Sequence, residues 1–245
     1  MSDQGEYAPG VDRARVPRHV ALIMDGNGRW AEARGYPRTA GHAQGEPALF
    51  DVIDGARLLG VEWLTAYTFS TENWTRSADE VEFLMHFNAD VLERRRDQLH
   101  AANTRIIFIG DRHDPRVPDA LRSRIASAES LTEHNTGMTT VFAFNYGGRS
   151  ELVAAARAIA QQAAAGGLSS VDEKVFASHL SVPDMPDVDL VIRSSGEHRT
   201  SNFLPWQAAY AEYVFSPVLW PDFDREVLAA CIEEYQARER RFGKA

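Results

Sequence analysis

The sequence predicts a single α/β domain in which about six largely parallel strands form a sheet flanked by helices. Six short apolar, strand-like runs alternate with amphipathic stretches along the 245 residues. Strands separated by helices form parallel sheets through right-handed crossovers. A chain of this length, 44% hydrophobic and 25% charged, is long enough for one sizeable core and short for two full domains. We therefore expect a polar, flexible segment over residues 1–17 and one domain over residues 18–245.

Each predicted strand is a short apolar run, and the runs cover residues 20–24, 63–69, 105–109, 139–145, 188–192 and 213–216. Apolar side chains at helical spacing predict helices over 29–34, 41–59, 77–102, 118–134, 149–164, 171–180 and 222–242. Ser77 and Glu80 form a capping box that defines the start of the long helix after residue 76. Pro47 leaves the start of the helix over 41–59 open, because proline is tolerated only in a first turn.

Composition excludes several classes of protein. The formal net charge of −9 argues against a general nucleic-acid binder, so any polyanion must be met by local Arg clusters. Cys231 is the single cysteine, which excludes an internal disulfide framework and Cys-based zinc sites. No segment has the length of a transmembrane helix, and residues 1–17 carry no apolar signal region. We expect a cytoplasmic protein that meets membrane lipids only through a groove, a tunnel or peripheral contact.

The stretch HVALIMDGNGRWAEARG, residues 19–35, carries the most chemical information. Asp25 follows the first predicted strand, where open α/β sheets bind ligands. Gly26 and Gly28 permit close approach of the backbone to an anion, and Arg29 adds positive charge. Asp25 could then hold a divalent cation between phosphate oxygens. A tight turn capped by Asp25 explains the same pattern equally well, and the GxGxxG and GK[ST] patterns of nucleotide loops are absent.

Three further polar constellations adjoin the predicted strands. FSTENWTR, residues 69–76, is by itself more typical of a loop that leads into a helix and carries a packed Trp than of a substrate loop. In RSSGEHRTS, residues 193–201, two Arg and several hydroxyls surround a Gly, which suits a diphosphate clamp. Glu212 lies in an apolar setting, where it pairs with an Arg or helps to bind metal, and the sequence alone favours pairing.

Other catalytic motifs are missing. The chain has no DDxxD, GxSxG, HExxH or CxxC pattern. These absences leave interpretations as a hydrolase with a catalytic triad, a zinc protease or a thiol oxidoreductase without support.

Most of the chain resembles one family. In order along the sequence, HVALIMDGNGRWAEARG, RTAGH, FSTENWTR, FNYGGR, DLVIRSSGEHRTSNFLPWQAAYAEYVF and RERRFG are similar to the signatures of the cis-prenyltransferases, the undecaprenyl and decaprenyl diphosphate synthases. The resemblance implies a magnesium-dependent isoprenyl transferase over residues 18–245, a homodimer with a hydrophobic product tunnel. It would add isopentenyl diphosphate in cis to an allylic diphosphate, and the polyprenyl diphosphate would serve as a lipid-carrier precursor for cell-wall synthesis. A synthase of short or branched prenyl diphosphates and a non-catalytic subunit are the alternatives.

The resemblance also assigns roles to residues. It implies Asp25 and Asn73 as catalytic residues, and Asp25 with Glu212 as ligands of Mg²⁺. Asn73 matches a position sometimes assigned as proton acceptor, but a neutral amide is a poor base, so we expect it to orient a diphosphate oxygen or water. The implied substrate-binding residues are Gly26, Asn27, Gly28, Arg29, Trp30, Arg38, His42, Ser70, Thr71, Glu72, Trp74, Arg76, Arg193, Arg199, Thr200, Ser201, Arg241 and Gly243.

Two further expectations concern residues away from the reacting diphosphates, namely a terminal motif and the wall of the tunnel. Arg241 and Gly243 match a terminal RxG motif that reaches across the dimer into the neighbouring site. Pro47 and Phe50 are departures from the family's pattern that add rigidity and bulk near the wall expected to line the tunnel. One large side chain in a tunnel can stop elongation by overlap alone. We therefore expect product length to depend on this wall.

Overall fold

The computed structural model describes residues 7–238, and its centre is a parallel sheet with the strand order β3-β4-β2-β1-β5-β6. The strands are β1 (His19–Ile23), β2 (Trp63–Ser70), β3 (Arg105–Ile109), β4 (Thr139–Tyr146), β5 (Leu190–Arg193) and β6 (Glu212–Phe215). Every neighbouring pair is parallel. The predicted single α/β domain with six parallel strands is confirmed.

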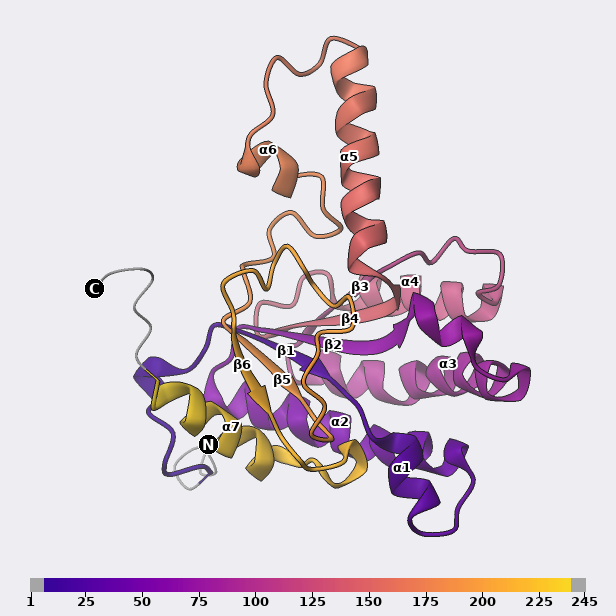
Figure 1. Ribbon diagram of the computed structural model, residues 1–245, viewed down its shortest axis with the longest axis vertical. Coiled ribbons are helices and arrows are strands. Elements are labelled where there is room, and N and C mark those ends of the chain that lie inside the picture. The colour runs from indigo at the N-terminus through magenta and orange to yellow at the C-terminus, as the bar shows by residue number, and fades with distance from the viewer. Residues whose placement is uncertain (1–6, 239–245) are drawn as a thin grey trace.

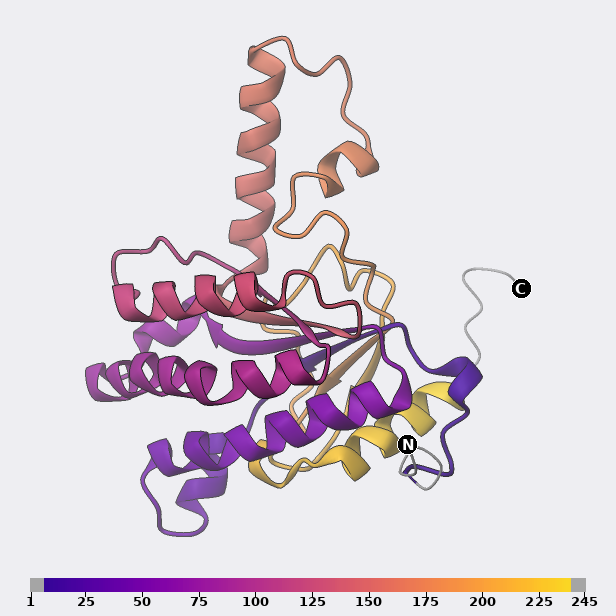
Figure 2. The ribbon, with the colours of Figure 1, turned by 180° about the vertical axis from the view of Figure 1, so that it is seen from behind.

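The helices cover the sheet unequally. They are α1 (Asn27–Glu32), α2 (Arg38–Leu59), α3 (Ala78–Ala101), α4 (Asp119–Thr132), α5 (Gly148–Ala164), α6 (Glu173–Ala177) and α7 (Arg225–Gln236), with 3-10 turns η1 (Arg13–Arg15), η2 (Thr71–Thr75) and η3 (Trp220–Asp222). Figure 2 shows α2, α3, α4 and α7 side by side across one face. In Figure 1, α5 projects away from the sheet with α6 beside it.

The buried core lies in two layers, one on each face of the sheet. Because side chains alternate along a strand, Val20 and Leu22 of β1 belong to the layer under α2 and α7, whereas Ala21 and Ile23 belong to the opposite layer. That opposite layer is completed by side chains from residues 182–211, which form mainly loops. All five residues of β1 are buried, as expected for a parallel strand covered on both faces.

Several predicted boundaries shift. Helix α2 begins at Arg38, so Pro47 lies inside it rather than in its first turn. The helix expected over 171–180 shortens to α6, and α7 begins at Arg225 with Asp224 as its N-cap. Residues 7–17, part of the segment expected to be flexible, pack against α7, and the Tyr7 hydroxyl donates a hydrogen bond of 2.6 Å to the carbonyl of Arg225. Between residues 7 and 238, no helix combines the length and apolar character needed to span a bilayer.

Candidate active site

The carboxyl ends of β1 and β5 bring Asp25 and Arg193 together. These strands are neighbours, and Ile23 lies opposite Arg193 in the register. The Arg193 side chain is only 4% exposed, and its Nη2 lies 2.8 Å from Oδ2 of Asp25. Its Nη1 donates to the carbonyl of Arg199 at 2.6 Å and to the hydroxyl of Ser201 at 2.8 Å. Two sequence motifs 168 residues apart therefore form one charged centre.

The turn after β1 holds the Asp25 carboxylate in place. Gly26 has φ +104°, and a Cβ there would lie 2.8 Å from the Leu219 side chain, so only glycine fits without strain. The Gly26 amide donates to Oδ1 of Asp25 at 2.7 Å, while the hydroxyl of Ser194 accepts from the Asp25 amide at 2.8 Å. Each carboxylate oxygen thus has a partner, because Oδ1 faces the Gly26 amide and Oδ2 faces Arg193.

The surroundings keep Asp25 ionised. Burial by itself raises the pKa of its carboxyl, but the hydrogen bond and charge of Arg193, with smaller contributions from Ser195 and Arg29, outweigh burial and lower that pKa. The Arg29 guanidinium lies 3.4 Å from the same Oδ2. The Asp25 side chain is still 29% exposed, so an ionised oxygen ligand is accessible at this end of the sheet.

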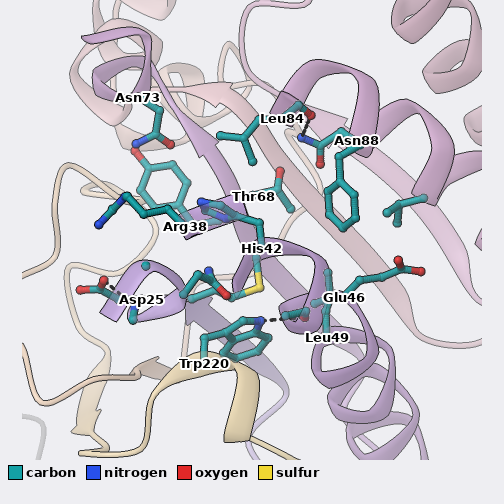
Figure 3. A pocket seen from close by; sticks show the side chains of 18 of the residues that line it. Asp25, Arg38, His42, Glu46, Leu49, Thr68, Asn73, Leu84, Asn88 and Trp220 are labelled. Carbon is teal, nitrogen blue, oxygen red and sulfur yellow. Dashed lines mark hydrogen bonds between the residues drawn. The ribbon is translucent and has the colours of Figure 1, made fainter. Parts of the chain in front are cut away.

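A cavity of about 200 Å³ opens beside Asp25. Figure 3 shows its lining, with Asp25 from the turn after β1, His42 from α2 and Asn88 from α3. Nine of the residues predicted as site residues line it, namely Asp25, Gly26, Asn27, Gly28, Arg29, Arg38, His42, Asn73 and Arg76.

Glu80 organises the cationic side of this cavity, and the sequence did not identify it as a site residue. Its Oε1 lies 2.6 Å from Nη1 of Arg76 and 3.2 Å from Nε2 of His42, and its Oε2 lies 3.6 Å from Nε of Arg38. Burial raises the pKa of the Glu80 carboxyl, but the charge of Arg76 and the hydrogen bonds from His42 and Arg76 outweigh it and lower that pKa. Burial, followed by the charge of Arg76, lowers the pKa of His42. Glu80 thus holds two guanidinium groups at the cavity while His42 is kept neutral at pH 7.

Asn73 presents a hydrogen-bond donor to the cavity. The backbone amide of Ser70 donates to Oδ1 of Asn73 at 2.9 Å. A backbone N–H can only donate, so the amide oxygen must face Ser70 and the NH₂ group is left for a ligand. This orientation suits contact with a diphosphate oxygen and does not suit abstraction of a proton.

The comparisons with known proteins agree with this geometry. The family model that describes undecaprenyl diphosphate synthases matches residues 23–243. The chain belongs to this family, the cis-prenyltransferases.

Two curated relatives and one solved structure show how close the similarity is. The chain is 55% identical to the trans,polycis-polyprenyl diphosphate synthase of Thermobifida fusca, named as specific for (2Z,6E)-farnesyl diphosphate, over 98% of this chain and 86% of that one. It is 52% identical to the decaprenyl diphosphate synthase of Mycobacterium tuberculosis, over 94% and 78% respectively. The crystal structure of lavandulyl diphosphate synthase from Lavandula x intermedia in complex with dimethylallyl diphosphate superposes with a TM-score of 0.91 at 38% identity, covering 94% of this chain and all of that one.

Several residues with substrate-binding roles implied by the family do not line the cavity of this cis-prenyltransferase. The Trp30 indole donates to Asp222 at 2.7 Å, under the Arg34 guanidinium. The Trp74 indole donates to Asn145 at 2.7 Å, which fits the packed Trp that the sequence alone favoured. The residues outside the cavity lining are Trp30, Ser70, Thr71, Glu72, Trp74, Arg193, Arg199, Thr200 and Ser201. Of these, Arg193 contacts Asp25 directly, and Ser201 contacts Arg193. Arg241 and Gly243 lie outside the described residues.

Glu212 and Asp25 are not brought together within one chain. Glu212 lies opposite Leu190, which lies opposite Val20. Glu212 is therefore level with Val20 across the sheet, and Val20 lies five residues, or about 17 Å of strand, before Asp25. Oε2 of Glu212 is 2.9 Å from Nη1 of Arg238, the kind of pairing favoured by the sequence alone. A shared magnesium site is thus not formed within a single chain, and residues 7–238 contain no cluster of three His, Cys, Asp or Glu able to hold a metal.

The site still fits magnesium in another way. Mg²⁺ is usually bound by one or two carboxylates together with substrate phosphates and waters, rather than by a cage of protein ligands. Asp25, ionised and partly exposed beside a cavity rich in Arg, provides the one carboxylate that such a site requires.

A second, apolar cavity of about 40 Å³ adjoins the first, on the side away from Asp25. Both cavities are lined by Leu49, Thr68, Asn88 and Val91. Phe50 lines only the apolar one, as expected for the wall after His42. Among residues 7–238 the structure shows these as two adjoining cavities, so the hydrophobic product tunnel that the resemblance implies stays a prediction.

Proposed function

We propose that this chain condenses isopentenyl diphosphate with an allylic diphosphate in cis and releases a prenyl diphosphate. The observation that carries the proposal is the ionised Asp25, held by Arg193 beside a cavity rich in Arg that continues into an apolar cavity. A diphosphate bearing a hydrocarbon chain needs these two environments side by side.

The described residues account for the chemistry at the diphosphate end. When the allylic C–O bond breaks, negative charge develops on the leaving diphosphate, and preorganised donors stabilise that charge most effectively. Arg29, Arg38 and Arg76 supply guanidinium groups at the cavity, and Asn73 supplies an NH₂ donor. Magnesium held by Asp25 and the diphosphate oxygens would neutralise the same charge. The isopentenyl double bond then attacks the allylic carbon, and loss of a proton completes the new cis double bond.

The relatives guide the choice of substrate and product. By analogy with the Thermobifida fusca and Mycobacterium tuberculosis enzymes, we propose a linear polyprenyl product that serves as a lipid-carrier precursor for cell-wall synthesis. The similarity to lavandulyl diphosphate synthase keeps short or branched products as the second candidate. Purified protein should be incubated with isopentenyl diphosphate, allylic primers of increasing length and Mg²⁺, and its products resolved by mass and double-bond geometry. Lengthened cis products that disappear with EDTA are expected, and free diphosphate without chain growth would refute the proposal.

We further propose a homodimer in the cytoplasm that touches membranes peripherally through its lipid product. Two observations support the dimer. Helix α5 projects from the domain and leaves Val153 57% exposed. Glu212 lies on the edge strand β6, where it could serve a site of a second copy although it does not reach Asp25 of its own chain. Light scattering coupled to gel filtration should give twice the chain mass of 27.3 kDa, and a monomer mass would refute the dimer.

A further inference from the structure

Glu46 of α2 binds two Arg side chains of α3. Its side chain is 10% exposed and lines the cavity beside Asp25. Nε of Arg95 lies 2.9 Å from Oε1 of Glu46, and Nη2 of Arg94 lies 2.6 Å from Oε2. A carboxylate so little exposed is stable when its charge is balanced and its oxygens accept hydrogen bonds, and both conditions are met here.

Arg95 also forms part of the wall of the apolar cavity. Its guanidinium carbon lies 4.8 Å from the centre of the Phe50 ring, and both side chains line that cavity. Phe50 belongs to α2, so the stacked pair spans from one helix to the other. Arg94 differs, because its side chain is 53% exposed and lines neither cavity.

We propose that Glu46 fixes Arg95 on Phe50 as an ionic brace that closes the wall of the apolar cavity and limits the length of the product. The proposal rests on the proposed function, since it assigns the apolar cavity to the growing hydrocarbon chain. A growing chain that pushes between α2 and α3 must lift Arg95 from Phe50 and break its ion pair with Glu46. A hydrocarbon replaces none of those hydrogen bonds, so the largely buried carboxylate would lose one of its partners.

The brace therefore separates two properties of the enzyme. The residues that contact the reacting diphosphates lie around Asp25, whereas Arg95 acts only on the space available to the chain. Loss of the Arg95 guanidinium should change the product length while condensation with a short primer continues.

The test compares Arg95→Met and Glu46→Gln with Arg94→Met as the matched control. Arg95→Met keeps an apolar stem over Phe50 and removes the guanidinium, whereas Arg94→Met removes the other cation of the same carboxylate without touching either cavity. Thermal unfolding checks that each variant folds. If one of the two brace variants does not fold, the other still tests the proposal.

Total incorporation of labelled isopentenyl diphosphate is measured separately from product length. For Arg95→Met and Glu46→Gln we expect at least a tenfold larger fraction of products beyond the longest wild-type length. For Arg94→Met we expect the wild-type distribution. An unchanged distribution in both brace variants, or an equal shift in Arg94→Met, overturns the proposal. Wild-type protein that incorporates no isopentenyl units would instead refute the proposed function.

A binding experiment tests the brace without any reaction. Titration calorimetry with decyl, tetradecyl and octadecyl phosphate measures how affinity grows with chain length. The preference for octadecyl over decyl phosphate should increase at least tenfold in Arg95→Met relative to wild type, because burial of two further methylene groups suffices for such a factor. The same preference in both proteins would show that Arg95 does not limit the cavity and would overturn the proposal.

Discussion

Removal of the Asp25 carboxylate should affect stability and catalysis by amounts that the structure allows to be separated. Loss of one partner of a buried ion pair costs about 3–5 kcal/mol. Asp25 is 29% exposed, and Arg193 keeps its hydrogen bonds to the Arg199 carbonyl and the Ser201 hydroxyl, so the lower end of that range applies to Asp25→Ala. For a chain of this size, about 3 kcal/mol corresponds to a fall in Tm of about 6–12 °C. Asp25→Asn keeps an oxygen that accepts from Arg193 and should lose less.

The fall in kcat should depend on the loss of the negative charge at position 25 rather than on the loss of stability. Both variants lose the ionised ligand that the site offers to magnesium, so kcat for condensation should fall by at least about 10²–10³-fold, the range found when one preorganised stabilising group is removed. Steady-state incorporation of isopentenyl diphosphate at saturating Mg²⁺ measures this, with Asp222→Asn as control. Asp222 binds Trp30 and the exposed Arg34 outside the cavity, so kcat should hardly change. Asp25→Asn with wild-type turnover would refute the role of Asp25.

Three further predictions follow from single contacts. Burial lowers the pKa of His19 from 6.5 to about 4, so the unfolded chain takes up a proton first as pH falls. Stability should therefore decrease by about 1.6 kcal/mol between pH 6.5 and 5. Urea unfolding should show that His19→Gln flattens this slope, and equal slopes would contradict it. Asn73→Asp should lower kcat about 10–100-fold, because a donor to a charged group becomes a repelling oxygen. If residue 73 instead acted as the base that removes the proton, Asp would be a stronger base than Asn. An unchanged or faster rate would therefore support the role of base. Asp25→Asn chains and Glu212→Gln chains should each be inactive alone. If Glu212 serves the partner's site, exchange of subunits between the two variants should restore about a quarter of the wild-type activity. No recovery would leave Glu212 without that role.

The fold could be predicted from the sequence because its signal is repeated. Each strand of the sheet is a short apolar run, and each crossover except the one from β5 to β6 carries helical periodicity, so errors at single boundaries leave the topology unchanged. The misplaced start of α2 shows the limit of local rules. Pro47 argued for a late start, but the turns before it pack closely on the turn after β1, where a Cβ on Gly41 would lie 2.0 Å from the Asn27 carbonyl. Tertiary packing therefore outweighs the local cost of proline.

The sequence could predict only those contacts of the site that lie at the ends of neighbouring strands. Asp25 follows the buried strand β1 and Arg193 ends the buried strand β5. Neighbouring parallel strands end at the same edge, so the proximity of these two residues follows from topology. Glu80 shows the opposite case, since its spacing from Ser77 reads as a helix cap and nothing local indicates contact with His42 from another helix. For Glu212 the resemblance to a family suggested a role at the metal, but the register of β6 places it at the far end of the strand.

The pairing of the site's Arg residues would allow an acidic chain to bind the two diphosphates of the proposed reaction. Unpaired guanidinium groups gathered at one cavity would repel one another and destabilise the fold. Here Arg29 lies 3.4 Å from Asp25 and Arg76 lies 2.6 Å from Glu80, and both Arg side chains line the cavity. A diphosphate that enters the cavity therefore replaces a carboxylate as the partner of these guanidinium groups. Its binding free energy is the difference between the attraction of a guanidinium for the diphosphate and for the carboxylate, and is smaller than the attraction of an unpaired guanidinium for a diphosphate. A carboxylate freed by this exchange is available to magnesium, so binding of the metal and of the diphosphate should reinforce each other at Asp25.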